Sequence, residues 1–243
     1  RYETHFNGKK VNVMEYDVSG FMQQCVESYI KLAGGPNNVK LRKVKTPFVE
    51  IADTRKFNGH FLAEDELEAK PGEDAGQLAD VAASVLMKIL YGARQARWDL
   101  LKGVSLLATR LTKWTKGCDR ALHRLVSYID STSHLVLRGW VGDDWNELAL
   151  KLFSDADFAG DRPSMRSTTG GYLALTGTST WFPLAAKSKR QTATSHSTPE
   201  SEIVAADDVT RTIGIPALDL WEFLLGRSVG LDLFEDNQAC LQI

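Results

Sequence analysis

The sequence predicts an α/β protein in which a mainly helical region precedes a sheet domain. Apolar residues recur at the helical spacing from about residue 80 to residue 130, whereas short apolar runs alternate with polar turns after about residue 135. The second region reads as three strands, two helices and a fourth strand, an order typical of α/β folds. The expected domains are residues 1–79, 80–140 and 141–243.

The first domain is expected to contain one strand and one helix. The strand covers KKVNVMEYDV at 9–18, and the helix covers GFMQQCVESYIKLAGG at 20–35, where Gly34 and Gly35 end it. Residues 46–76 have weak periodicity and an acidic run, which predicts an exposed loop.

The middle domain is predicted to hold two amphipathic helices joined by a short turn, with Asp99 and Asp119 as their N-caps. Their buried faces would be formed by Val104, Leu107, Ala108, Leu111 and Trp114, and by Leu122, Leu125, Val126 and Ile129. Residues 86–125 carry nine Lys or Arg residues, Lys113 and Lys116 among them, and only two acids. This basic surface suits contact with nucleic-acid phosphates, although ordinary solvated helix faces explain it equally well.

The last domain is predicted from apolar runs separated by Gly-containing and polar turns. Its helices should cover 199–213, opened by Ser197 or Thr198, and about 217–226. Its expected strands are LALKLF at 148–153, TGGYLALTG at 169–177, STWFPLA at 179–185 and VGLDLFED at 229–236, and one further strand, LVLRGW at 135–140, is expected just before it.

Three acidic side chains lie where these elements begin or end. Asp155 follows the 148–153 strand, Glu202 falls in the first turns of the crossover helix, and Asp236 closes the last strand. If the two strands are parallel neighbours, the three carboxylates meet at one sheet edge. Clustered carboxylates repel each other unless a cation neutralises them, and oxygen ligands suit Mg²⁺ or Mn²⁺. The alternative is that the aspartates are turn residues and that Glu202 favours the helix N-terminus.

Four segments carry a family resemblance: SDADFAGD, MRSTTGGYLALTG, TWFPLAAKSKRQTATSHSTPESEIVAA and LFEDNQA. In order and spacing they resemble the ribonuclease H domain of copia-type retrotransposon polyproteins. Upstream, FMQQCVESY, KTPF, LMKILYGARQARWDLLKGVSLLATRLTKW and LHRLVSYIDSTSHL resemble the end of the reverse transcriptase with its thumb and connection. The resemblance implies a ribonuclease H-like mixed sheet, truncated after its fourth strand, behind a mostly helical thumb and connection region.

The resemblance also implies a reaction. Matched by motif, Asp155, Glu202 and Asp236 would be the catalytic, metal-binding carboxylates. Two Mg²⁺ or Mn²⁺ ions would then support hydrolysis of the RNA strand of RNA–DNA hybrids. The expected partners are such a hybrid and the remainder of the polyprotein. Candidates for phosphate contact in the KSKRQ loop are Lys187, Lys189 and Arg190, for which a solvated loop is the alternative.

Other functions are disfavoured or remain open. The closest string to the Tyr-x-Asp-Asp motif of polymerases, Tyr128 to Ser131, has no second aspartate, so polymerase activity is not expected. A catalytically inactive nucleic-acid-binding fragment and a decayed element are the alternatives to a nuclease. Three widely spaced cysteines argue for reduced thiols. No apolar run approaches the length of about 20 residues that a membrane-spanning helix needs. The resemblance places the chain inside the cell, in cytoplasmic particles or the nucleus.

Overall fold

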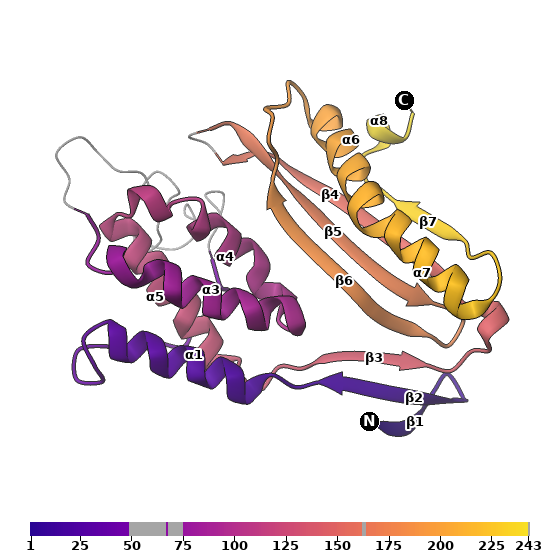
Figure 1. The fold of residues 1–243 in the computed structure, drawn as a ribbon, viewed down its shortest axis with the longest axis horizontal. Helices are drawn as coiled ribbons and strands as arrows, with labels where there is room; N and C mark the ends of the chain where they lie inside the picture. Colours follow the sequence, from indigo (N-terminus) through magenta and orange to yellow (C-terminus); the bar gives the residue numbers. More distant parts are fainter. Residues whose placement is uncertain (49–66, 68–74, 162–163, 243) are drawn as a thin grey trace. The chain divides into compact units, whose positions relative to one another are not determined.

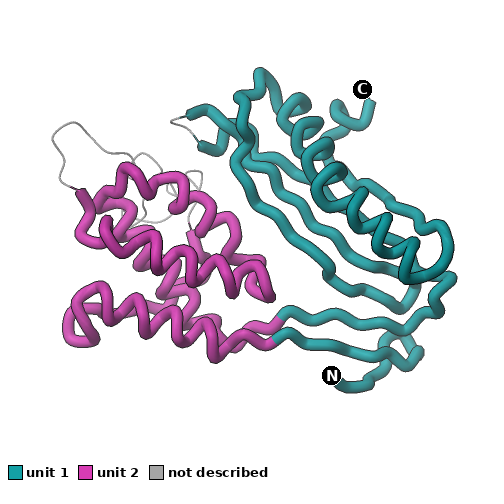
Figure 2. Tube along the Cα trace, viewed as in Figure 1, with its two compact units in different colours: residues 1–16, 137–243 teal, residues 17–136 magenta. Residues whose placement is uncertain are grey.

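The computed structural model describes residues 1–48, 67, 75–161 and 164–242 (Figure 1). The chain forms two compact units, one of residues 1–16 with 137–243 and one of residues 17–136 (Figure 2). This division differs from the three consecutive domains expected from the sequence. The reason is that residues 12–16 pair with residues 137–141, so the first unit is assembled from both ends of the chain.

The first unit is built on a mixed sheet, which confirms the α/β class. In the described part of the chain this sheet has seven strands in the order β1-β2-β3-β6-β5-β4-β7. All neighbouring strands are antiparallel except β4 and β7, which are parallel. The strands are β1 Tyr2–Phe6, β2 Lys9–Tyr16, β3 Leu137–Val141, β4 Ala149–Asp161, β5 Arg166–Thr176, β6 Trp181–Arg190 and β7 Leu231–Phe234.

The N-terminal hairpin extends this sheet beyond the strands predicted for the last domain. Asn7 and Gly8 connect β1 to β2 with φ of 50° and 78°, the left-handed conformation that an Asn-Gly hairpin turn requires. Asp143 ties the hairpin to the rest of the sheet, because one carboxylate oxygen accepts from Lys9 Nζ at 2.9 Å and the other from the Ser179 backbone N–H at 2.6 Å.

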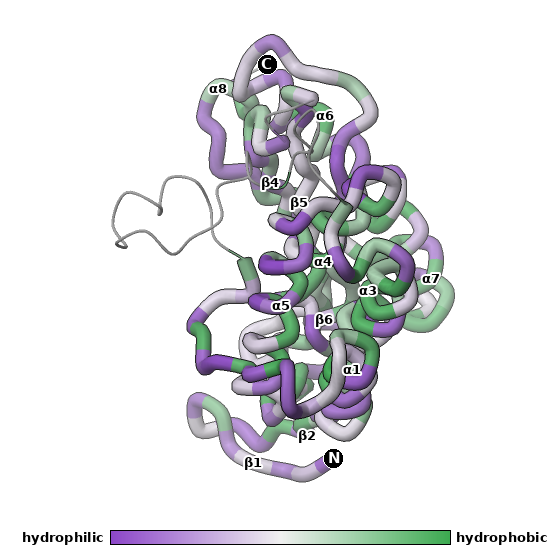
Figure 3. The backbone as a smooth tube through the Cα atoms, turned by 90° about the vertical axis from the view of Figure 1, so that its left-hand side faces the viewer, coloured by the Kyte–Doolittle hydropathy of each residue, from purple (hydrophilic) through white to green (hydrophobic). Residues whose placement is uncertain are grey.

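One long helical segment covers the central strands. α6 (Thr198–Val209) begins at Ser197, whose hydroxyl accepts from the Glu200 N–H, and it packs on β4 and β5. A π-helical turn at Thr210–Gly214 leads directly into α7 (Ile215–Leu225), so the two predicted helices have no loop between them. α7 ends at Gly226 with φ of 64° and is mostly hydrophobic along its length (Figure 3).

The core of the sheet unit lies between the strands and this helical segment. Each fully buried aliphatic side chain there contributes about 1.5–3 kcal/mol. Partly buried side chains of α7, including Leu218 and Trp221, pack against this core. The buried residues are Leu148, Leu150, Leu152, Leu173, Leu175, Val209 and Val229.

The second unit is mainly helical in the part that the structure describes. Its elements are α1 Ser19–Leu32, α3 Ala79–Gln95, a 3-10 turn Trp98–Leu100, α4 Leu101–Ala108, a 3-10 turn Leu111–Lys113 and α5 Lys116–Ser131. The exposed loop expected at 46–76 lies mostly outside the described residues. Among the helices that the structure describes, none is both long and apolar enough to cross a membrane.

Both predicted caps in this unit are wrong. Asp99 forms an ion pair with Arg97 at 2.8 Å, and α4 begins without a side-chain cap. Thr115 caps α5, since its hydroxyl accepts from the Cys118 N–H at 3.1 Å. Asp119 instead accepts from the Trp114 indole N–H at 2.7 Å and from backbone N–H groups that precede α3. In both cases the carboxylate that the sequence pattern assigns to the helix start instead binds donors outside that helix start.

Candidate metal centre

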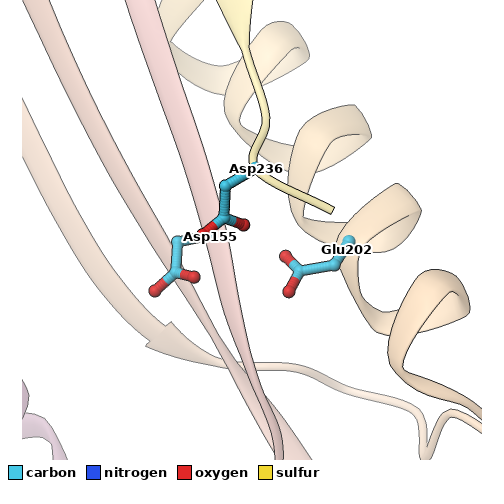
Figure 4. Close-up of side chains that lie close together, drawn as sticks. All are labelled: Asp155, Glu202 and Asp236. Carbon is cyan, nitrogen blue, oxygen red and sulfur yellow. The ribbon is translucent and has the colours of Figure 1, made fainter. Parts of the chain in front are cut away.

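Three carboxylates meet where β4, α6 and β7 converge. Asp155 lies on β4, Glu202 in the second turn of α6, and Asp236 two residues after the end of β7. One oxygen from each lies within 4.8 Å of the others, and Glu202 points towards the two aspartates (Figure 4). The parallel pairing of β4 with β7 ends at Phe153 and Phe234, so each aspartate lies two residues beyond the last pair.

The strand that carries Asp155 is longer than predicted. β4 continues to Asp161, so Asp155 lies inside the strand and not after its end. The continuation is paired, because Asp155 lies opposite Gly170 and Asp157 opposite Thr168 on β5, with an irregularity between Asp157 and Asp161. Asp155 therefore lies on a paired strand and not in a turn.

Glu202 is the buried member of the cluster, with 4% of its surface exposed. Burial is the main reason that the pKa of its carboxyl group rises to about 7. The negative charges of Glu235, Asp155 and Asp236 raise the pKa in the same direction, while a hydrogen bond from the Ala156 N–H opposes them. Oε2 of Glu202 has no hydrogen-bond partner among the described residues. A bound cation would supply the missing partner and offset the repulsion.

The donor set fits a hard divalent cation. All three groups offer carboxylate oxygens, which Mg²⁺ and Mn²⁺ prefer, and no His or Cys belongs to this cluster. Asp155 and Asp236 are exposed, so an ion held by them would remain open to water and to a substrate. Glu202 is buried, so it would bind such an ion from the side away from solvent.

A further carboxylate, Glu235, was given no role in the sequence prediction. Its Oε2 accepts from the Ser154 hydroxyl at 2.7 Å, and its Oε1 accepts from the backbone N–H groups of Asp236 and Asn237, both at 3.1 Å. The parallel register, continued by one residue, places Ser154 opposite Glu235, so the alignment of LALKLFS with VGLDLFE was the available signal.

The basic residues predicted to contact phosphates occupy other places. Lys187, Lys189 and Arg190 lie on β6, not in a loop, because they pair with β5. Lys187 forms an ion pair with Asp208 at 2.6 Å, and Arg190 forms one with Asp161 at 2.7 Å.

Lys189 is exposed and lines a hollow of about 380 Å³ beside α6, together with Arg190 and Arg211. The three clustered carboxylates do not line this hollow. Lys113 and Lys116 are exposed residues of the helical unit.

Comparison with known proteins adds no family assignment: no protein-family model matches the chain, and no curated protein matches it.

Proposed function

We propose that the chain is a metal-dependent nuclease of the ribonuclease H type that hydrolyses the RNA strand of RNA–DNA hybrids. One observation carries the proposal: Asp155, Glu202 and Asp236 converge from β4, α6 and β7, and the buried Glu202 has an oxygen without a partner in the described part of the chain. The motif resemblance to copia-type polyproteins supplies the substrate class and the ribonuclease H-like identity of the fold. The parallel pairing of β4 with β7 is compatible with both.

In this proposal the three carboxylates would hold Mg²⁺ or Mn²⁺. When bound, two such ions supply an activated water and stabilise the leaving 3′-oxygen. The chain's own contribution is positional, because β4 and the turn after β7 hold two exposed carboxylates. Glu202, anchored on a helix that packs against the core, holds the third.

Substrate contact is the second part of the proposal. Lys189 at the hollow beside α6, and Lys113 and Lys116 in the helical unit, are exposed cations suited to backbone phosphates. Lys187 and Arg190 would have to exchange their partners Asp208 and Asp161 for phosphate. The parent protein would be a retrotransposon polyprotein acting in cytoplasmic particles or the nucleus.

The test is cleavage of an RNA–DNA hybrid whose RNA strand is labelled, with Mg²⁺ or Mn²⁺ and with EDTA. We expect metal-dependent cutting of the RNA strand. Asp155→Asn and Asp236→Asn should slow it at least about 100-fold, equivalent to about 2.7 kcal/mol of transition-state stabilisation. Asp232→Asn is the matched control, because Asp232 is an exposed aspartate of β7 outside the cluster.

Three results would contradict the proposal. Cutting that persists in Asp236→Asn would remove the cluster from the reaction. Binding of the hybrid without cutting by the unmodified chain would favour an inactive nucleic-acid-binding fragment, and neither binding nor cutting would favour a decayed element.

A further inference from the structure

Glu235 connects the two strands of the candidate metal centre beyond the point where their backbone pairing ends. The last β4–β7 pair is Phe153 with Phe234. One residue further along, the Ser154 hydroxyl donates to Glu235 Oε2 at 2.7 Å. A side-chain hydrogen bond thus takes the place of the next backbone pair.

The same carboxylate shapes the turn that carries Asp236. Glu235 Oε1 accepts from the N–H groups of Asp236 and Asn237, both at 3.1 Å. Asn237 in turn caps the short helix α8 (Gln238–Leu241), since its side chain accepts from the Cys240 N–H at 3.0 Å. One charged group therefore fixes the backbone on both sides of Asp236, and hydrogen bonds to a charged acceptor are stronger than those between neutral groups.

Ser154 and Glu235, the two residues joined by the side-chain hydrogen bond, are direct chain neighbours of two candidate metal ligands. Ser154 immediately precedes Asp155, and Glu235 immediately precedes Asp236. The Ser154 side chain is buried, with 7% of the residue exposed, so its hydroxyl has little access to water as a substitute partner. Both oxygens of Glu235 already accept hydrogen bonds from the chain, which suits a support better than a ligand.

We propose that Glu235 is a positioning residue: by joining Ser154 to the backbone around Asp236, it holds the Asp155 and Asp236 carboxylates at the separation that a divalent cation needs. The inference rests on the proposed function. Removing a group that orients metal ligands typically weakens metal binding about 10- to 100-fold.

The experiment measures Mn²⁺ affinity by calorimetric titration of the full chain, which requires no nuclease activity. We expect Glu235→Ala to weaken Mn²⁺ binding about 10-fold or more. Glu235→Gln should stay within about threefold of the unmodified chain, because its amide oxygen accepts from both N–H groups and its NH₂ donates to Ser154 Oγ. Ser154→Ala should fall between the two.

Glu222→Ala is the matched control. Glu222 Oε1 accepts from the Ser228 hydroxyl at 2.9 Å and from the Val229 N–H at 3.1 Å, a similar contact in the segment before β7 and outside the cluster. We expect it to lower stability and to leave Mn²⁺ affinity unchanged. Circular dichroism verifies that each variant is folded.

The outcomes separate this inference from the nuclease proposal. Unchanged affinity in Glu235→Ala overturns the positioning role alone. Equal losses in Glu235→Gln and Glu235→Ala show that the charge of Glu235 matters more than its geometry, which also overturns it, as does an equal loss in Glu222→Ala. If the unmodified chain binds no Mn²⁺, the proposed function fails and the positioning role fails with it.

Discussion

At the residue scale, Glu202 is a buried acid that ionises at a cost in the metal-free chain. Its pKa rises from 4.5 to about 7 on folding, chiefly through burial. Between these two values the folded chain binds more protons than the unfolded chain, so the free energy of unfolding falls as pH rises from 4.5 to 7. We expect this to cost about 2 kcal/mol, less than the full shift implies because solvent screens the exposed aspartates nearby.

Glu202→Gln carries a neutral amide at this position and should abolish that fall. Urea unfolding in EDTA at pH 5 and pH 8 measures the free energy of unfolding of both chains. Relative to the unmodified chain, the free energy of unfolding of Glu202→Gln should be about 2 kcal/mol higher at pH 8 than at pH 5. An identical difference at both pH values would show that Glu202 does not titrate in this window.

At the element scale, the position of α6 depends on a glycine beneath it. A Cβ added to Gly171 on β5 would lie 2.6 Å from Val209 Cγ1, and Val209 is fully buried on the inner face of α6. Gly171→Ala must push the helix away from the sheet, at a cost of about 1–3 kcal/mol. The helix carries Glu202, so Mn²⁺ affinity should fall as well.

The adjacent Gly170 provides the matched control for stability. Its added Cβ would meet Asp155 atoms no closer than 3.5 Å, which is ordinary contact. Chemical denaturation should therefore show Gly170→Ala to be clearly less damaging than Gly171→Ala. Equal losses would mean that chain entropy in β5, and not the approach of α6, decides the cost.

The elements also show where sequence patterns succeed. The apolar runs of LALKLF and VGLDLFED, which alternate with polar residues, identify β4 and β7, and Ser197 with Pro199 marks the start of α6. The extension of β4 through SDADFAGD was missed because Asp and Gly are typical of turns. It is a strand only because β5 supplies partners, as Thr168 does for Asp157. The charged KSKR segment likewise reads as a loop from its sequence alone, because its strand conformation depends on pairing with β5.

At the scale of the whole molecule, the first unit depends on pairing that no local pattern reveals. Asn12 on β2 lies opposite Val141 on β3, although the whole helical unit separates them in sequence. Local periodicity identifies both strands but not their partners, so the consecutive domains expected from the sequence differ from the two compact units. The cluster was predictable because its members follow recognisable motifs, whereas the bond between Ser154 and Glu235 depends on register.

The division into units leads to a prediction about where a cation acts. All three candidate ligands belong to the sheet unit, so Mn²⁺ at about 100 times its dissociation constant should stabilise that unit by about 2.7 kcal/mol. Hydrogen exchange should slow in β4, β5 and α6 and stay unchanged in α1, α3 and α5. Asp236→Asn should abolish the effect. If hydrogen exchange slows equally in both units, the two units unfold together. If it slows in neither unit, the cation does not bind at the cluster.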